Sequence, residues 1–313
     1  MKRVKMKTDA CWPSFIIAGA AKSGTTSLSM LLKEHPDVYL PEREMNYFAF
    51  ARDIPTLRLL NNKRIVKELE DYHSYYKFEG NTDLICGEKS VSYMYFPWTE
   101  RVIRNIKEIH PNWEQLKIVI ILRQPVERMY SQYLFNRNFQ EKLPFEKAIN
   151  VWEKRKQENW VPAYDYAGAS FYSDSLTLFK ENFEHLCVFL LDDLKERPEW
   201  VFGQLLDFLG ARTDRLPEHP NRPYNTGGIP KKDLFGRMYG LLKGSLPAAF
   251  LKKMIPLNSQ RKLQALLKSK LFYKPALDAK IKWELNKMFE TDIKRLQNIL
   301  DRDLSHWLKP VNT

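Results

Sequence analysis

Cysteine is scarce in this chain of 313 residues. The three cysteines, Cys11, Cys86 and Cys187, lie far apart, and no two of them form a C-x-x-C pair. This excludes a disulfide-stabilised scaffold and leaves no zinc-finger spacing. The six histidines also lack the spacing of metal ligands, so we expect no bound metal. A chain of this length can bury a core without such cross-links.

Long apolar runs are also missing. The longest, 15–21 and 118–122, fall well short of the ~20 residues that a membrane-spanning helix needs. The N-terminal stretch MKRVKMKTDACWPSF is basic, but no long apolar segment follows it, so we expect no secretory signal. We therefore expect a soluble, cytoplasmic protein whose residues 1–11 form a flexible arm.

Positive charge, in contrast, is plentiful. Lysine and arginine number 50 against 38 acidic residues, which gives a net charge of +12. Such a surplus favours anionic partners such as nucleotide phosphates, sulfated glycans, nucleic acid or a membrane surface, although it also promotes solubility. No RNA-recognition or zinc-finger signature accompanies it, so nucleic acid is not expected as a partner.

Apolar segments alternate with amphipathic ones along the first two thirds of the chain. Strands are expected at 15–18, 38–40, 116–122 and 186–191, and helices at 27–35, 56–79, 125–139 and 198–209. This order predicts an α/β fold of the P-loop-like, three-layer type, with a mostly parallel central sheet and helices on both faces. After residue 231 the pattern is helical, most clearly over 283–300, and no strand is expected there. We interpret 12–313 as a single domain, with 231–313 as a helical cap.

The segment that joins the first strand to the first helix, IAGAAKSGTTSL (17–28), has the pattern of a phosphate-binding loop. Gly19 and Gly24 have the spacing of the glycines in the NTPase motif G-x-x-x-x-G-K-[ST], and Thr26 fits its last position. Thr25 stands where the lysine should be, and Lys22 lies inside the loop instead. Backbone N–H groups in such a turn, together with the helix N-terminus, attract phosphate. A helix start with chance glycines and a solvated lysine is the alternative.

The displaced lysine bears on the chemistry. In an NTPase loop the lysine reaches the β- and γ-phosphates and the Ser/Thr holds Mg²⁺. A lysine inside the loop lies nearer the end of a short 5′-phosphate group, where it can neutralise charge on a leaving phosphate. This favours a donor with one 5′-phosphate that bears a transferable group, and it weakens the case for Mg–ATP.

AAKSGTTSL resembles the 5′-phosphosulfate loop of the sulfotransferases that use 3′-phosphoadenosine 5′-phosphosulfate (PAPS). The resemblance covers about 14–230 and is closest to the heparan sulfate and bacterial branch. It implies PAPS as donor, 3′-phosphoadenosine 5′-phosphate (PAP) as product, and no need for a metal. It also implies that the loop residues bind the phosphosulfate: Lys22, Ser23, Gly24, Thr25, Thr26 and Ser27.

ILRQPVERMYSQY resembles the family's 3′-phosphate segment. Its matching residues are Arg123, at the end of the predicted strand 116–122, and Ser131 on the following helix. A guanidinium fork suits a dianionic phosphate. Arg128 is interpreted as a structural ion-pair partner. A surface arginine with a helix-face serine is the alternative.

REMNYF (43–48) resembles the K-E-x-H-F-F segment of the heparan sulfate branch, whose glutamate is the base. Sulfuryl transfer to a hydroxyl needs such a base, because an alcohol is a poor nucleophile. The resemblance assigns this role to Glu44, with Glu42 as the nearest competitor and a solvated loop glutamate as the alternative. Asn46 stands in place of the family's histidine, so a histidine base is lacking here.

Weaker resemblances add further candidates. GEKSVSY (87–93) implies that Lys89 shares transition-state charge with Lys22, and that Glu88 orients Lys89 or the acceptor. AGASFY (167–172) implies an approach of Tyr172 to the nucleotide. The glycines and lysines of 225–232, with Gly228 and Lys231, suit a loop that covers a phosphate. Ordinary turns are the alternative for 87–93 and for 225–232.

Together these observations predict a PAPS-dependent O-sulfotransferase with Glu44, Lys22 and Lys89 as catalytic residues. A glycan or other carbohydrate-like hydroxyl compound is the predicted acceptor, and a small-molecule natural product is the alternative. The aromatic runs at 72–76 and 93–98 are candidates for lining an acceptor cleft. A P-loop nucleotide kinase or NTPase with Asp192 as magnesium ligand is a rival class, and a non-catalytic anion-binding protein is another. The sequence leaves the oligomeric state open.

Overall fold

A computed structural model describes residues 12–52, 56–59, 65–76, 83–215, 228–230 and 272–309. Its centre is a five-stranded sheet in which every neighbouring pair is parallel. In spatial order the strands are β2 (Val38–Tyr39), β3 (Ile85–Lys89), β1 (Phe15–Gly19), β4 (Lys117–Leu122) and β5 (Leu186–Leu190). The predicted α/β fold with a mostly parallel sheet is confirmed.

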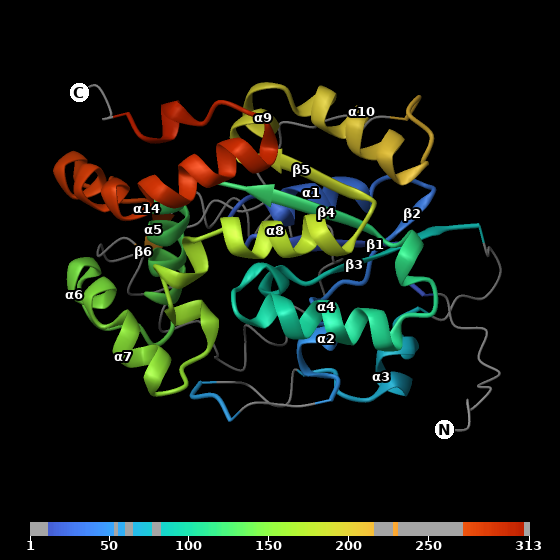
Figure 1. Cartoon of the computed structure of the whole chain (residues 1–313), viewed down its shortest axis with the longest axis horizontal. Coiled ribbons are helices and arrows are strands. Elements are labelled where there is room, and N and C mark those ends of the chain that lie inside the picture. The colour runs from blue at the N-terminus through green and yellow to red at the C-terminus, as the bar shows by residue number, and fades with distance from the viewer. Residues whose placement is uncertain are drawn as a thin grey trace, which may run out of the picture.

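Alternate residues of the central strands pack into two separate cores, because successive side chains of a strand point to opposite faces. Ile16, Ile118 and Ile120 belong to one core, and Ile17 and Val119 to the other. The first core is covered by α4 (Trp98–Ile109), α5 (Pro125–Asn136), α8 (Ser173–Asn182) and α14 (Ala279–Leu300). The second is covered by α1 (Thr25–Leu32), α9 (Leu191–Glu196) and α10 (Pro198–Leu209). Figure 1 shows α4 and α8 in front of the sheet and α1 behind it.

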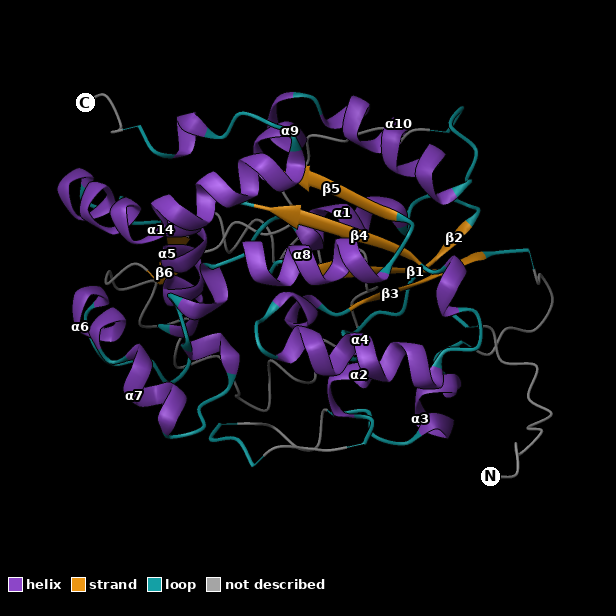
Figure 2. Cartoon of the chain, viewed as in Figure 1, coloured by secondary structure: helices purple, strands orange, loops and turns teal. Residues whose placement is uncertain are grey.

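Shorter elements surround this framework (Figure 2). The helices are α2 (Tyr47–Phe50), α3 (Leu69–Ser74), α6 (Phe145–Asn150) and α7 (Trp152–Gln157). Single 3₁₀ turns occupy Val91–Met94, Trp113–Gln115, Pro162–Tyr164, Gly168–Ser170 and Ser305–Trp307. A small antiparallel pair, β6 (Ile229–Pro230) and β7 (Phe272–Tyr273), lies apart from the main sheet. The strand β7 overturns the expectation that no strand follows residue 231.

The helix predicted over 56–79 is wrong for most of its described part. Only α3 is helical, and Arg58 instead forms a parallel bridge with Trp160. The Arg58 N–H donates to the carbonyl of Asn159 at 2.7 Å, and the Val161 N–H donates to the Arg58 carbonyl at 3.2 Å. These long-range backbone bonds outweigh a weak local helical preference.

Two further elements were not predicted from the sequence. The helix α9 begins at Leu191, directly after β5, whereas Leu191 was expected to end the strand. The strand β3 has the sequence ICGEK, whose glutamate is fully buried. Buried carboxylates are rare in sheet interiors unless hydrogen-bonded, so a charged residue at this position hides the strand from pattern analysis.

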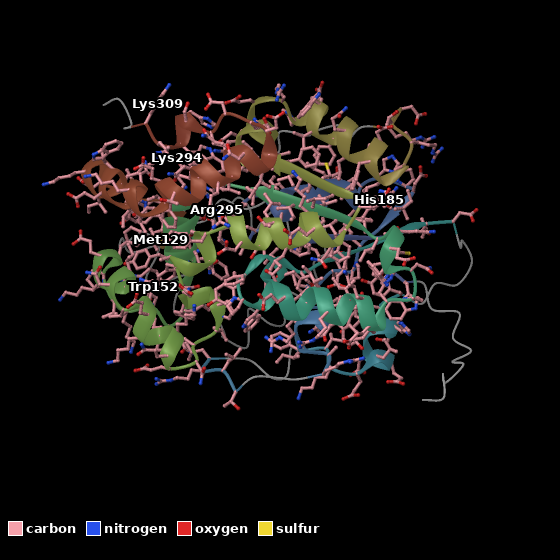
Figure 3. All side chains as sticks on the ribbon, in the orientation of Figure 1. Met129, Trp152, His185, Lys294, Arg295 and Lys309 are labelled. Atoms are coloured by element: carbon pink, nitrogen blue, oxygen red, sulfur yellow. The ribbon has the colours of Figure 1, made fainter. Side chains whose placement is uncertain are left out.

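The C-terminal helix α14 packs against the sheet domain and confirms the helix predicted over 283–300. Gln124 before α5 donates to Asn286 at 2.6 Å. Figure 3 marks Met129 on α5, which is fully buried, and Lys294 on α14, whose side chain is exposed. Within the described part of the chain, no helix has the length and apolar character needed to cross a bilayer. The predicted arm, residues 1–11, lies outside the described residues.

Candidate functional site

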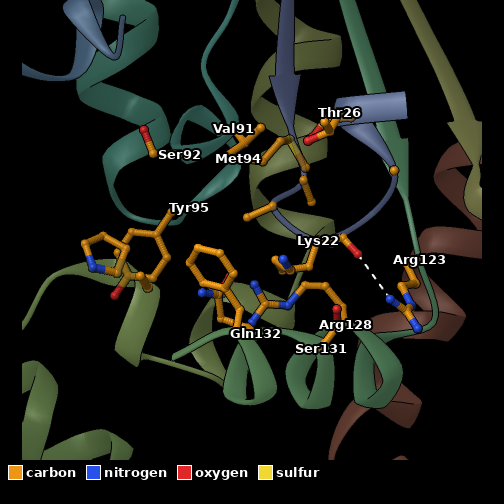
Figure 4. Close-up of a pocket in the computed structure, with 18 of the residues that line it drawn as sticks. Lys22, Thr26, Val91, Ser92, Met94, Tyr95, Arg123, Arg128, Ser131 and Gln132 are labelled. Carbon is orange, nitrogen blue, oxygen red and sulfur yellow. Dashed lines mark hydrogen bonds between the residues drawn. The ribbon is translucent and has the colours of Figure 1, made fainter. Parts of the chain in front are cut away.

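A cavity of about 1170 Å³ opens at the carboxyl edge of the sheet, where ligands of open α/β sheets bind. Figure 4 shows it with Lys22 and Arg128 between Arg123 on one side and Tyr95 and Ser92 on the other. Most of the site residues predicted from the sequence line this one cavity: Lys22, Gly24, Thr25, Thr26, Ser27, Glu44, Arg123 and Ser131.

The loop after β1 is shaped to receive an anion. Gly24 has φ +102°, a conformation that favours glycine, and a Cβ there would lie 2.8 Å from Cδ1 of Leu191, so the Leu191 side chain would have to move. The helix α1 starts at Thr25, and no side chain caps its N-terminus. The first N–H groups of a helix lack intrahelical partners and, with the helix dipole, attract negative charge.

Lys22 points its ammonium group into the cavity from within this loop. Its backbone has φ +67°, in the left-handed region, and its Nζ lies 4.3 Å from the centre of the Phe135 ring. Burial, followed by the positive charges of Arg128 and Arg123, lowers the pKa of Lys22 to about 8, while Glu44 opposes this shift. The lysine is therefore a cation at neutral pH that lies in an environment already rich in positive charge.

Arg123 follows β4 and meets the same loop. Its Nη1 donates to the Lys22 carbonyl at 3.3 Å, and its Nη2 lies 3.2 Å from Oε2 of Glu127. Its Nε is buried and has no hydrogen-bond partner. Buried donors are nearly always satisfied in folded proteins, so an unpaired guanidinium N–H beside a cavity fits a site for a ligand oxygen.

Glu127 is the counter-ion of this cluster. Burial alone would raise its pKa, but hydrogen bonding and attraction from Lys282, together with Arg123, outweigh burial and lower the pKa to about 2. Lys282 Nζ lies 2.9 Å from Oε1 of Glu127, so α14 contributes directly to the charge balance at the cavity.

The interpretation of Arg128 as an ion-pair partner is wrong. Its side chain is almost fully buried, its Nε donates to Ser170 Oγ at 2.7 Å, and its Nη2 donates to the Tyr166 carbonyl at 3.1 Å. Among the described residues, no carboxylate forms a salt bridge with it. Burial lowers its pKa from the ordinary value. Arg128 also lines the cavity, so a bound anion would offset its charge.

One face of α5 carries the cavity floor. Arg128, Ser131, Gln132 and Phe135 all line it, at positions i, i+3, i+4 and i+7 of the helix. Residues at this spacing lie on the same helix face. This arrangement brings Ser131 to the same cavity as Arg123, as the resemblance implies.

Glu44 lies in the loop between β2 and α2 and is about one third exposed (35%). Its Oε1 lies 3.3 Å from Nζ of Lys89, the last residue of β3. Lys89 itself does not line the cavity, so it contacts the site through Glu44. Glu44 and Lys89, both predicted as catalytic residues, therefore form an ion pair.

The resemblance implied that Glu88 orients Lys89 or the acceptor, but the Glu88 side chain has other partners. It is fully buried, and its carboxylate accepts hydrogen bonds from the hydroxyls of Tyr72 (2.6 Å), Ser90 (2.6 Å) and Tyr93 (2.5 Å). Ser90 Oγ in turn accepts a hydrogen bond from the Asn46 N–H at 2.8 Å. Glu88 thus fixes the loop that carries Glu44.

Three predicted nucleotide contacts that the structure describes do not line the cavity: Ser23, Tyr172 and Gly228. Ser23 and Tyr172 are fully buried, and the Tyr172 hydroxyl donates to the Arg123 carbonyl at 3.0 Å. Tyr172 therefore holds the Arg123 backbone in place. Gly228 is buried beside Tyr273, and its carbonyl accepts from Asn138 at 2.9 Å. Lys231 lies outside the described residues.

The sequence analysis missed several charged residues of the site. Glu127 could have been found, because it lies four residues after Arg123 and pairs with it. Lys195, Lys274 and Lys282 come from distant parts of the chain, and no local signal identifies them. Lys195 and Lys274 line the cavity. Within the described residues, no group of three or more His, Cys, Asp or Glu side chains could hold a metal ion.

Comparison with known proteins gives a family match over most of the fold. A family model described as "Sulfotransferase family" matches residues 13–215. That range includes every strand of the main sheet and the predicted site residues up to Tyr172.

Individual relatives share part of their sequence with this chain. The membrane-associated sulfotransferase kil1 of Dictyostelium discoideum is 32% identical over 132 residues, covering 40% of this chain and 23% of that protein. The mouse bifunctional heparan sulfate N-deacetylase/N-sulfotransferase 4 is 25% identical over 151 residues, covering 48% of this chain and 16% of that protein. The chain thus spans less than a quarter of the length of each of these relatives.

A solved structure extends the likeness to nearly the whole chain. The crystal structure of a sulfotransferase from Alicyclobacillus acidocaldarius superimposes with a TM-score of 0.70 and 23% sequence identity. It covers 96% of this chain and 100% of that one. At this identity the likeness establishes the fold.

Proposed function

Because the chain belongs to the sulfotransferase family, we propose that it transfers a sulfuryl group from PAPS to a hydroxyl acceptor and releases PAP. The observation that carries this proposal is the position of Lys22 inside the loop, on the same cavity as Glu44. The names of the relatives favour a carbohydrate acceptor, as the resemblance also does.

The residues of the cavity fit such a donor. The lining cations within the described chain are Lys22, Arg123, Arg128, Lys195 and Lys274, and the lining acids are Glu44 and Glu127. This positive excess suits a multiply charged nucleotide. Lys22 and the N–H groups at the start of α1 would hold the 5′-phosphosulfate. Arg123, with its unpaired Nε, and Ser131 would hold the 3′-phosphate.

Each residue has a distinct chemical task in this proposal. When bound, PAPS supplies the sulfuryl group that the acceptor oxygen takes. Glu44 accepts the proton of the acceptor hydroxyl at its carboxylate. Lys22 offsets negative charge that develops at the phosphate, and Lys89 orients Glu44 through the 3.3 Å ion pair. Preorganised cations of this kind stabilise a transition state without reorganising water.

Replacement of Glu44 by glutamine tests the base. Glu44→Gln should lower kcat by about 10²- to 10⁴-fold, because the amide cannot accept the proton. The Kd for PAP should stay within about twofold of wild type. Glu42→Gln is the matched control, since Glu42 lies in the same loop but pairs with Lys33 at 3.5 Å. Unchanged kcat in Glu44→Gln would remove Glu44 from the base role.

Competition between nucleotides tests the reaction class. A P-loop kinase or NTPase would bind ATP–Mg²⁺ more tightly than PAP. Asp192, the magnesium ligand of that alternative, accepts a hydrogen bond from Trp307 Nε1 at 3.0 Å and does not line the cavity. Calorimetric titration with PAP and with ATP–Mg²⁺ should favour PAP, and the reverse order would contradict the proposal. The cytoplasmic location and the single domain over 12–313 stay predictions.

A further inference from the structure

The cavity has two chemically different ends. Its charged end contains Lys22, Arg123, Arg128 and Lys274. The other end includes apolar and aromatic residues of α2, the residue after the turn Val91–Met94, the start of α4 and the start of the turn Pro162–Tyr164: Phe50, Tyr95, Trp98, Val161 and Pro162. Figure 4 shows Tyr95 and Ser92 away from Arg123, across Lys22.

The aromatic side chains of this end pack against one another. The rings of Phe50 and Trp98 lie 5.5 Å apart, and those of Tyr95 and Trp98 lie 5.8 Å apart, both edge to face. The Tyr95 hydroxyl is engaged, because it donates to Asp165 at 2.8 Å. Phe50 and Tyr95 are only 5% and 8% exposed, so the partly exposed Trp98 offers most of the aromatic surface of this cluster to the cavity, and such a surface suits a flat or apolar body.

The polar residues at this end are uncharged and already bonded to each other or to neighbours. Ser92 Oγ donates to Asn46 Oδ1 at 2.6 Å, and Gln132 donates to Asn136 at 3.0 Å. Of the arginines near this end in the described chain, Arg101 lies 5.1 Å from the centre of the Trp98 ring but does not line the cavity, and Arg128 lines the cavity one helical turn before Gln132. Sulfate and carboxylate groups of a glycan are normally recognised by several arginine or lysine side chains, and the aromatic residues Phe50, Tyr95 and Trp98 supply none to a polyanion.

The volume of the cavity also supports a compact acceptor. At about 1170 Å³ the cavity exceeds the roughly 300–1,000 Å³ typical of a single-ligand site. It can therefore hold a donor together with a compact second molecule. Phe135, which is 44% exposed, also lines the cavity, with Lys22 Nζ 4.3 Å from its ring centre.

We propose that the acceptor is an uncharged hydroxyl compound with a flat apolar or aromatic body, which is bound against Trp98, Tyr95 and Phe50 with its hydroxyl towards Glu44. This inference rests on the proposed function and narrows it. It selects the small-molecule alternative over a sulfated or carboxylated glycan.

Binding to the PAP-loaded protein tests this assignment without requiring turnover. The probes are 2-naphthol, as the aromatic hydroxyl compound, and heparosan, as the carboxylated polysaccharide. We expect 2-naphthol to bind the PAP complex and heparosan neither to bind nor to displace it. Trp98→Ala should weaken 2-naphthol by about tenfold or more while the Kd for PAP is unchanged.

Two further variants sharpen the test. Trp98→Phe keeps an aromatic ring and should recover most of the affinity, which separates contact with the ligand from a general loss of packing. Trp200→Ala is the control, because Trp200 is 45% exposed on α10, does not line the cavity, and has Arg197 4.3 Å from its ring centre. It should leave both affinities unchanged.

The outcomes separate the two proposals. Failure of the wild type to bind PAP would overturn the proposed function. With PAP bound, the assignment of the acceptor is overturned if heparosan binds and 2-naphthol does not, if neither binds, or if Trp98→Ala leaves 2-naphthol affinity unchanged.

Discussion

At the scale of single residues, the site is dominated by the unusual surroundings of Lys22. Its ammonium group is buried near two guanidinium groups and lies over an aromatic ring. Such an environment disfavours the charged form, which explains why its pKa falls to about 8 rather than remaining near that of an ordinary lysine. The only lining acids described near it, Glu44 and Glu127, are each shared with another cation.

This shift predicts a pH dependence of PAP binding. Because the pKa of Lys22 is lowered to about 8, the group is cationic below that pH and loses its charge as pH rises through it. The affinity for PAP should therefore be highest below pH 8 and fall above it. Lys22→Arg should abolish this inflection, since a guanidinium stays charged. Calorimetric titration from about pH 6.5 to 9.5 measures it.

Controls identify the group that titrates. Lys154→Arg, at a position whose side chain is 73% exposed on α7, should leave the inflection in place. The burial of Lys274, with repulsion from Arg123, also lowers its pKa, so Lys274→Arg is the necessary comparison. An inflection that persists in Lys22→Arg and disappears in Lys274→Arg would contradict the assignment.

At the scale of elements, β3 holds the loop of Glu44 in place through hydrogen bonds. Its Glu88 gathers three hydroxyl donors, and one of these, Ser90, accepts the Asn46 N–H two residues after Glu44. Burial raises the pKa of Glu88, and the three hydroxyl hydrogen bonds oppose this. Asn46 has φ +50°, so the loop depends on this anchor to hold its turn.

We predict that Glu88→Gln weakens both folding and turnover. The amide offers one acceptor oxygen and an NH₂ group that competes with the hydroxyl donors, so the free energy of unfolding should fall by about 1–3 kcal/mol. The value of kcat should fall while the Kd for PAP remains close to wild type, because the change acts through the position of Glu44. Urea unfolding and steady-state kinetics measure the two effects.

Tyr72→Phe provides the comparison for this variant. It removes one of the three donors to Glu88 but leaves Ser90 and its bond to Asn46 intact. Stability should fall with little change in kcat. Equal loss of kcat in both variants would show that Glu88 acts through packing alone.

The elements also show how far sequence analysis reaches. Lys22 and residues 24–27 of the loop, together with Arg123 and Glu44, line one cavity as predicted, because local spacing and the order of strand and helix determine where they lie. Arg128 was misread, since a mid-helix arginine reveals nothing about its tertiary partners. Lys282 was missed because it meets Glu127 across 155 positions of sequence. The strand β3 was missed because it contains a buried glutamate. The hydroxyl groups that hydrogen-bond to this glutamate belong to residues outside the strand, so the sequence of the strand alone does not reveal them.

At the scale of the whole molecule, α14 links the C-terminal segment to the core and to the site. Asp292 is buried and accepts from the N–H groups of Tyr172 (2.9 Å) and Ser173 (3.1 Å) and from the Ser173 hydroxyl (2.5 Å). It therefore caps α8 and positions Tyr172, whose hydroxyl holds Arg123.

Asp292→Ala should lower the free energy of unfolding by about 2–3 kcal/mol, because it leaves buried donors without acceptors. The control is Asp174→Ala, which removes an exposed ion pair with Arg295 (2.8 Å) between the same two helices. Its cost should be under about 1 kcal/mol, as for most surface pairs. Urea unfolding of both variants measures the difference, and equal effects would contradict the capping role.

The left-handed backbone of Lys22 has a consequence for the evolution of this chain. An L-residue in that conformation costs about 1–2 kcal/mol relative to glycine, and a glycine at position 22 would relieve it. If stability alone were selected, glycine would be favoured over lysine at position 22. Lysine at this position costs some conformational free energy but places a positive charge in the active site. Lys22→Gly is therefore expected to raise thermal stability and to lower turnover.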